Sequence, residues 1–185
     1  MKKITLAILL TAGMSSDAVL ADDHTFSVGY AQSKVQDFKN IRGVNLQYRY
    51  EFDSPVSVVG SFTWMKGDES VREYDEQDLI TSQVDVDYFS LMAGPAYRVN
   101  DYVSFYALGG LAHTKTSGSY RVDYDDGFTE GGSHDGKSTN FAWGAGIIVN
   151  PMTNLSITAG YEGTKADLDG NHSINGFNVG VGYRF

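Results

Sequence analysis

The sequence predicts an all-β fold, an eight-stranded antiparallel transmembrane β-barrel with short periplasmic turns and long extracellular loops. Three observations predict it. Apolar and polar residues alternate with a period of two along most of the chain, which is typical of strands with one apolar face. Glycine (21 residues) and aromatic residues (13%) are abundant, as in tightly packed strands. The connections between alternating segments are short and long in turn, as in outer-membrane barrels.

The first 21 residues are typical of a secretory signal peptide. Lys2 and Lys3 give a basic start, residues 4–12 form a short apolar run, and small residues precede an expected cleavage between Ala21 and Asp22. A buried N-terminal helix would not explain the order of these features. We therefore expect a signal peptide at 1–21 and a barrel at 22–185. No later run reaches the roughly 18 apolar residues that a membrane helix needs.

The composition limits both stabilising forces and partners. The chain has no cysteine, so its stability must come from hydrogen bonds and packing even in a compartment that permits disulfides. The formal net charge is −9, and loss of Lys2, Lys3 and Asp17 with the signal peptide leaves −10. Such an acidic chain is not expected to bind nucleic acid.

The first three strands are expected at residues 25–34, 41–52 and 56–66. In the first, the apolar face holds Phe26, Val28 and Tyr30. In the second, apolar side chains at 44, 46, 48 and 50 alternate with Asn45, Gln47, Arg49 and Glu51. A turn at 53–55 contains Pro55 and leads into the third strand, whose apolar face holds Val58, Phe62 and Trp64.

Three more strands are expected at residues 84–99, 102–116 and 139–150. The first has Phe89, Leu91 and Tyr97 on its apolar face, and the last has the cleanest alternation in the chain, from Phe141 to Val149. In the strand at 102–116 apolar residues occupy both faces. We expect its outward face to hold Val103, Phe105 and Ala107, which puts Tyr106 and Leu108 on the inner face.

The last two strands are expected at residues 155–164 and 176–185. The closing segment, GFNVGVGYRF, has one apolar face, made by Phe177, Val179, Val181, Tyr183 and Phe185. Long polar stretches at 66–83 and 117–138 and a shorter one at 165–173 are expected to be loops. Because these stretches alternate with tight turns, we expect them all at one end of the barrel.

The apolar face could point either to a soluble core or to lipid. Several strands are near or above the roughly 9–11 residues that cross a bilayer at a tilt. Aromatic residues also fall in two groups, one near the tight turns (Tyr50, Phe52, Tyr97, Tyr102, Tyr183, Phe185) and one near the long stretches (Trp64, Phe89, Phe141, Trp143, Tyr161). Two aromatic belts are typical of an outer-membrane barrel, so the soluble lipocalin-like alternative is disfavoured.

Four segments of the chain also resemble a known family. They are FSVGYAQSKVQDFKNIRGVN (26–45), SLMAGPAYR (90–98), FAWGAGIIVNP (141–151) and INGFNVGVGYRF (174–185). The sequence resembles the Ail/Lom/OmpX family of enterobacterial outer-membrane proteins, most closely its PagC branch. The resemblance implies an eight-stranded barrel in the bacterial cell outer membrane. It also implies virulence through adhesion to or entry into host cells, serum resistance or phagocyte survival.

The end of the chain carries a further implication of this resemblance. A terminal Phe preceded by alternating aromatic and aliphatic residues resembles the signal by which the outer-membrane assembly machinery recognises its clients. We therefore expect Phe177, Tyr183 and Phe185 to form an assembly signal.

Charged residues are expected inside the barrel. The alternation places Arg49, Glu51, Arg98, Glu162 and Arg184 toward the lumen. Because eight strands enclose a space that side chains can fill, we expect a salt-bridged plug rather than a pore. A proton or solute relay is the less favoured alternative.

The sequence gives little support for a catalytic, metal or cofactor site. The histidines are scattered at positions 24, 113, 134 and 172, and no spacing marks a nucleophile, so we do not expect an enzyme. Residues 167–171 resemble part of a calcium loop but lack its remaining ligands. A turn held by aspartate and asparagine hydrogen bonds explains them equally well, and we expect neither metal nor cofactor.

The long polar stretches are acidic. Residues 66–82 have a net charge of −4 and residues 117–138 a net charge of −3. Apolar and aromatic side chains lie between the acids, at Tyr74, Leu79, Ile80, Tyr120, Tyr124 and Phe128. A host protein is therefore a better partner than a polyanion, and lipopolysaccharide phosphates would need divalent cations to approach these acids. The alternative is a structural envelope protein that alters membrane properties or vesiculation.

Overall fold

The computed structural model describes residues 23–36, 40–75, 78–123, 129–167 and 171–185. The expected signal peptide and the Ala21–Asp22 cleavage site lie outside the described residues. None of the described residues forms a helix that is long and apolar enough to cross a membrane.

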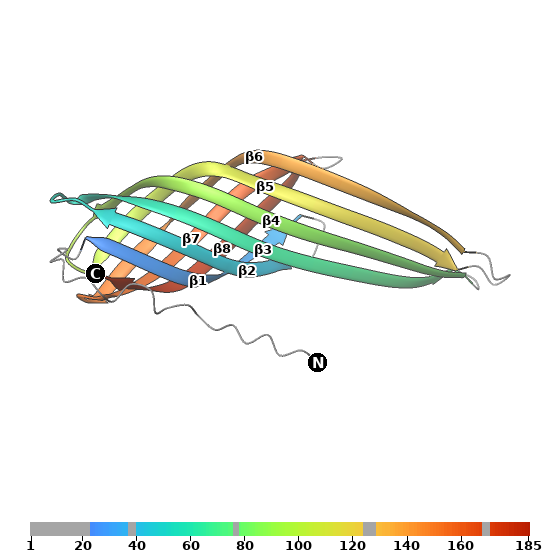
Figure 1. The fold of residues 1–185 in the computed structure, drawn as a ribbon, viewed down its shortest axis with the longest axis horizontal. Helices are drawn as coiled ribbons and strands as arrows, with labels where there is room; N and C mark the ends of the chain where they lie inside the picture. Colours follow the sequence, from blue (N-terminus) through green and yellow to red (C-terminus); the bar gives the residue numbers. More distant parts are fainter. Residues whose placement is uncertain (1–22, 37–39, 76–77, 124–128, 168–170) are drawn as a thin grey trace, which may run out of the picture.

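Eight antiparallel strands form a closed barrel (Figure 1), which confirms the predicted fold. They are β1 His24–Val35, β2 Asn40–Glu51, β3 Val56–Asp75, β4 Asp78–Arg98, β5 Val103–Asp123, β6 Thr129–Met152, β7 Leu155–Asp167 and β8 Asn171–Arg184. Each strand pairs with its neighbours in sequence, and β1 pairs with β8.

The closing segment pairs in full with the first strand. Val181 lies opposite Val28 and Val179 opposite Tyr30. At the periplasmic end the backbone of His24 donates to the Phe185 carbonyl at 3.1 Å, and Phe185 donates back at 2.8 Å. Closure satisfies backbone groups that would otherwise be unpaired in lipid.

The two faces of each strand differ as the alternation predicts. Phe105 is exposed on the outside, whereas Tyr106 and Leu108 are buried in the lumen. The expected orientation of this strand is thus confirmed despite its apolar residues on both faces. The lumen holds the ring of Tyr106 because Gly146 and Gly160 lie against its hydroxyl end, where a Cβ atom would clash.

The stretches predicted as loops at 66–83 and 117–138 are mostly strand, and this corrects the sequence reading. The central strands β3 to β6 have 20, 21, 21 and 24 residues, against 12 to 14 for β1, β2, β7 and β8. Pairing of β3 with β4 continues to Asp75 opposite Asp78. Backbone pairing continues although the apolar alternation of the barrel stops.

The extra length forms a flat projection beyond one end of the barrel (Figure 1). We call it the protruding sheet and define it as residues 67–75 of β3, 78–86 of β4, 115–123 of β5 and 129–138 of β6. The stretch at 165–173 is likewise strand up to Asp167 and again from Asn171, with 168–170 outside the described residues.

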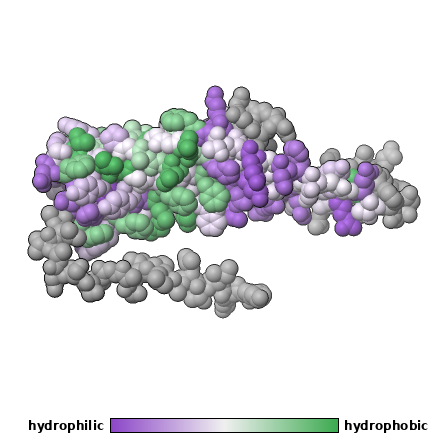
Figure 2. Space-filling model, turned by 45° about the horizontal axis from the view of Figure 1, so that its top comes forward, coloured by the Kyte–Doolittle hydropathy of each residue, from purple (hydrophilic) through white to green (hydrophobic). Residues whose placement is uncertain are grey.

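The outer surface shows where the bilayer lies. On the face drawn in Figure 2, hydrophobic side chains gather in a band over the barrel, and the protruding sheet beyond it is mostly hydrophilic. Both predicted aromatic belts are exposed at the edges of the barrel, represented by Tyr183 and Phe185 at one end and Trp64 and Trp143 at the other. The tight turns are therefore periplasmic, and the protruding sheet is extracellular.

Candidate functional site

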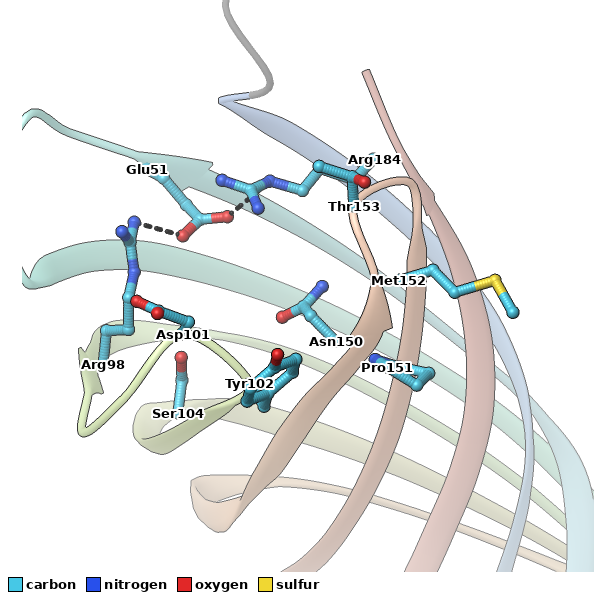
Figure 3. A pocket seen from close by; sticks show the side chains of 10 residues that line it. All are labelled: Glu51, Arg98, Asp101, Tyr102, Ser104, Asn150, Pro151, Met152, Thr153 and Arg184. Atoms are coloured by element: carbon cyan, nitrogen blue, oxygen red, sulfur yellow. Dashed lines mark hydrogen bonds and ion pairs between the residues drawn. The ribbon is translucent and has the colours of Figure 1, made fainter.

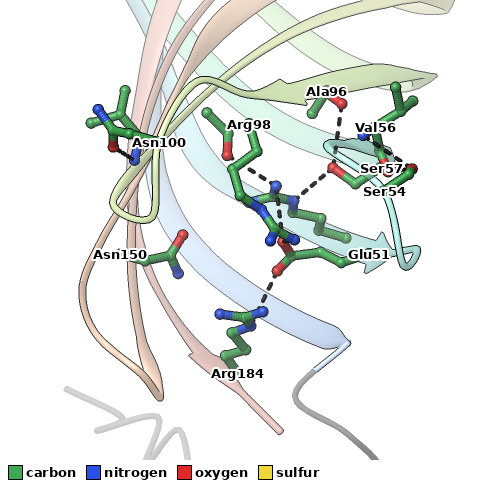
Figure 4. A network of polar contacts seen from close by, with 12 residues as sticks. Glu51, Ser54, Val56, Ser57, Ala96, Arg98, Asn100, Asn150 and Arg184 are labelled. Carbon is green, nitrogen blue, oxygen red and sulfur yellow. Dashed lines mark hydrogen bonds and ion pairs between the residues drawn. The ribbon is translucent and has the colours of Figure 1, made fainter.

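An ionic cluster closes the periplasmic end of the lumen (Figure 4). Its centre is Glu51, which is 3% exposed. Arg98 Nη2 lies 2.6 Å and Arg49 Nη2 lies 3.1 Å from Glu51 Oε1. Arg184 Nε lies 3.1 Å from Oε2. One carboxylate therefore holds three guanidinium groups.

Strand geometry explains this convergence. Arg49 and Glu51 are two residues apart on β2 and so share its inner face, while Arg98 and Arg184 are the last residues of β4 and β8. The buried Arg49 also donates from Nε to Ser57 Oγ at 2.9 Å and from Nη2 to Ser104 Oγ at 3.0 Å. These bonds fix its position in the barrel wall.

Glu162 occupies a separate place in the lumen. It is 3% exposed, and its carboxylate accepts hydrogen bonds from Thr63 at 2.9 Å and Ser90 at 3.5 Å. It lies in the lumen as expected, but among the described residues it forms no ion pair, so it is not part of a salt-bridged plug. The hydroxyl of Tyr88 is buried and has no hydrogen-bond partner among the described residues.

An apolar cluster fills the extracellular end of the lumen. Ile41, Met65, Val86 and Ile174 are each at most 4% exposed, and they come from four different strands. The lumen is therefore ionic at the periplasmic end, polar in the middle and apolar at the extracellular end. Side chains fill each layer, as expected for eight strands.

The alternation changes its character in the protruding sheet. The outward faces of the strands, apolar in the barrel, here present exposed charges such as Asp68, Lys115 and Asp135. The opposite face carries the buried Val86 and the half-buried Val84. Tyr120 is half exposed and lies against Gly132. For Tyr74, Leu79 and Ile80 the structure describes only the backbone, and Tyr124 and Phe128 lie outside the described residues.

The side-chain contacts of His24 and His113 join neither histidine to an acid or a serine in the described part of the chain. His24 Nδ1 lies 2.6 Å from the Tyr48 hydroxyl, and its ring stacks on Phe185. His113 Nδ1 lies 2.8 Å from Thr139 Oγ1 on the outer surface, and no described acidic side chain contacts this pair. Nor do the described residues include a group of three or more acids or histidines placed to hold a metal. The calcium-like segment falls partly outside the described residues.

Comparison with known proteins identifies the family. The sequence model of the enterobacterial Ail/Lom proteins matches residues 1–185. The chain belongs to the Ail/Lom family. It is 46% identical to the virulence membrane protein PagC of Salmonella typhimurium and 36% identical to outer membrane protein X of Escherichia coli K12, over the full length of each. These relatives confirm the resemblance seen in the four sequence segments.

Solved structures within the Ail/Lom family agree with the fold. Ail, the attachment invasion locus protein of Yersinia pestis, superposes with a TM-score of 0.69 at 34% identity, covering 88% of this chain and 99% of Ail. A second Ail structure, in complex with the heparin analogue sucrose octasulfate, gives a TM-score of 0.63 at 37% identity, covering 88% of this chain and 98% of Ail. This chain is therefore an outer-membrane barrel of a family that includes virulence proteins.

Sequence reasoning identified the lumen charges but not their grouping. Alternation assigns a side chain to the inner face, yet it does not say which level of the lumen the side chain reaches. The level depends on the stagger between strands, which brings Thr63 of β3 beside Glu162 of β7 although 99 residues separate them. For the same reason, the sequence did not predict the hydrogen bond from Ser90 to Glu162 or the burial of the Tyr88 hydroxyl.

Proposed function

We propose that the protein attaches the bacterium to a host protein through the protruding sheet, and that it forms no pore and catalyses no reaction. The filled lumen supports the absence of a pore. The observation that carries the proposal is a four-stranded sheet above a closed barrel, with no further strand on either side among the described residues. The names of the relatives PagC and Ail, which refer to virulence, attachment and invasion, support the same kind of activity.

The edges of the sheet provide a binding mechanism. Within the described residues, β2 pairs with β3 only up to Lys66, and β7 pairs with β6 only up to Ala142. In this part of the chain neither β2 nor β7 continues the pairing along residues 67–75 or 129–140, so the protruding sheet has an edge on each side. An extended segment of another protein can add to such an edge as a further strand.

The charge of the protruding sheet indicates the chemistry of the partner. The sequence of the sheet contains nine acidic residues and four basic ones, a net charge of −5. The acids are Asp68, Glu69, Glu73, Asp75, Asp78, Asp85, Asp123, Glu130 and Asp135, and the bases are Arg72, Lys115, Arg121 and Lys137. A basic extended segment fits this charge, whereas a polyanion would be repelled. Sucrose octasulfate, bound by Ail, is such a polyanion, so we expect the two proteins to differ in ligand.

Shortening the two hairpins tests this proposal. Residues 68–85 and 117–135 are replaced by two-residue turns, which rejoin positions that are paired in the wild type and leave the barrel intact. We expect attachment to host cells to fall to background, while the mobility of the unboiled protein on gels shows a folded barrel. Full attachment by the shortened barrel would contradict the proposal and favour the structural envelope role.

A charge variant gives a matched comparison. Reversal of Asp68 to lysine changes the β3 edge, and reversal of Asp53 to lysine makes the same single change in an exposed periplasmic turn. We expect only the first variant to lose attachment. Equal attachment by both variants would show that the acidic edge is not the binding surface.

We also propose that the barrel binds lipopolysaccharide phosphates at the level of the extracellular aromatic belt. A ring of exposed basic side chains faces outward where the barrel meets the protruding sheet. Lys34, Arg42, Lys66 and Lys165 belong to the barrel, and Lys115 and Lys137 lie at the base of the protruding sheet. Arg42 lies opposite Lys66, and Lys115 lies opposite Lys137. Basic residues at a membrane surface attract anionic head groups. The acids of the protruding sheet lie above this ring and leave it accessible from the bilayer.

Neutral variants test the basic ring. Changing Arg42, Lys66, Lys115 and Lys137 together to glutamine should weaken binding of lipopolysaccharide to the refolded barrel, measured against lipopolysaccharide from which the phosphates have been removed. The same number of glutamines at serine positions of the outward face of the protruding sheet is the control. Unchanged preference for phosphorylated lipopolysaccharide would contradict this part of the proposal.

A further inference from the structure

A pocket opens to the periplasm at the end of the barrel opposite the protruding sheet (Figure 3). Its volume is about 430 Å³, which is within the range of small-molecule sites. It is lined by the ionic cluster and by the adjoining turns, with Arg98, Asp101, Tyr102, Asn150 and Arg184 among its walls. Because side chains fill the lumen above it, ligands can enter only from the periplasm.

At the base of the pocket Arg49 and Arg98 share one buried carboxylate. Glu51 is the only acidic partner of Arg49 and Arg98 among the described residues. Both Glu51 and Arg49 are 3% exposed, so water screens their charges weakly. Asp101 also lines the pocket, but it is exposed in the turn between β4 and β5 and stays hydrated.

Arg98 has hydrogen-bonding capacity to spare. Its Nη2 donates to Glu51 at 2.6 Å, and its side chain makes no other hydrogen bond among the described residues. A guanidinium group has five N–H donors. The side chain is 35% exposed and borders the pocket, so its remaining donors are accessible to a ligand. The side chains of Tyr102 and Asn150 also line the pocket, as Figure 3 shows.

We propose that this pocket binds an oxyanion, a phosphate or carboxylate group, that reaches it from the periplasm. Arg98 provides the main contact, because an arginine fork binds two oxygens of a phosphate or carboxylate. Arg49 lies behind Glu51 and adds positive charge without contact. Asp101 opposes the ligand from the rim and weakens binding. Two sources of such a group are a phospholipid head group of the inner leaflet and a soluble periplasmic molecule.

The experiment is a titration of the full mature chain, refolded in detergent micelles, followed by nuclear magnetic resonance. The probes are inorganic phosphate, glycerol 3-phosphate and acetate, each compared with sodium chloride at equal ionic strength. We expect saturable shifts confined to Arg98, Tyr102 and Asn150. Preference for glycerol 3-phosphate would indicate a head group, and preference for the other two probes would indicate a soluble ligand.

Variants decide whether the site is specific. Arg98→Gln should weaken binding about tenfold or more, because charge-assisted hydrogen bonds are lost. Arg98→Lys should give an intermediate affinity. Asp101→Asn should bind the oxyanion more tightly, because a nearby negative charge is removed. Lys66→Gln at the opposite end of the barrel should change nothing. If Arg98→Gln fails to fold, the other variants still test the proposal. Shifts that chloride reproduces, or that no Arg98 or Asp101 variant alters, would overturn it.

Discussion

The lower and upper halves of β3 to β6 are parts of the same strands, yet they present different outer faces. In the lower half Phe62, Leu91 and Phe141 point outward to lipid. In the upper half the outward positions carry charges such as Asp68 and Lys137. The backbone pairing continues unbroken across the boundary. The solvent at the outer face therefore determines which residues lie there, while the ladder of backbone hydrogen bonds needs no particular residue type.

The side chains that fill the lumen also differ between its two ends. At the periplasmic end charged groups meet in a buried cluster that water can reach through the pocket. At the extracellular end Ile41, Met65 and Ile174 form an apolar layer. This arrangement closes the barrel beneath the protruding sheet.

Glu51→Gln should be the most destabilising single substitution. It leaves three guanidinium groups without their shared carboxylate, and loss of one partner from a buried ion pair costs about 3–5 kcal/mol. Urea unfolding of the refolded barrel measures the free energy. Arg98→Leu should cost less, because its side chain is 35% exposed against 3% for Glu51. If Glu51→Gln were as mild as Asp53→Asn in the adjoining turn, the cluster would not hold the lumen together.

Leu91→Arg should lower the free energy of unfolding by about 2–4 kcal/mol, the cost of a lipid-facing arginine near the bilayer midplane. Leu91 is 68% exposed on the outer face of β4. Gln83→Arg, on the same face of the same strand but in the protruding sheet, is the matched control and should cost almost nothing. Equal effects in the two variants would place the membrane boundary elsewhere on β4.

Deleting Phe185 should slow insertion and leave the protein in the periplasm, because we propose that Phe177, Tyr183 and Phe185 form the signal for the assembly machinery. All three side chains are exposed on the outer face of the closing segment. Asn178→Ser changes the neighbouring inner face and should insert almost normally. Pulse-chase fractionation measures both rates. Normal insertion without Phe185 would reduce its role to that of an interfacial anchor.

Asp87→Asn should have the smallest effect, below about 1 kcal/mol, since exposed ion pairs contribute little. Asp87 pairs with Lys66 at 2.9 Å near the extracellular rim, and the lysine is 61% exposed. The same unfolding experiment, repeated at high salt, measures the contribution. A cost close to that of Glu51→Gln would mean that burial is not what separates the two ionic sites.

The sequence predicted the barrel well because the period-two pattern depends only on local geometry. Alternate side chains of a strand point to opposite faces, so Arg49 and Glu51 had to share the inner face wherever the strand lay. The same reasoning oriented β5 correctly although Tyr106 and Leu108 are apolar. The prediction failed in the protruding sheet. Its outer face meets water, so the strands there lack the apolar alternation by which strands are recognised.

By itself, the sequence determined the number of strands, their inward and outward faces, the two aromatic belts and the family. The tertiary structure alone decided that the acidic stretches form a sheet, that Glu51 gathers three arginines and that Glu162 stands apart from them. Which face a side chain occupies follows from neighbouring residues on one strand. Which side chains meet depends on the stagger and closure of all eight strands, and these are set by pairings between residues far apart in the chain.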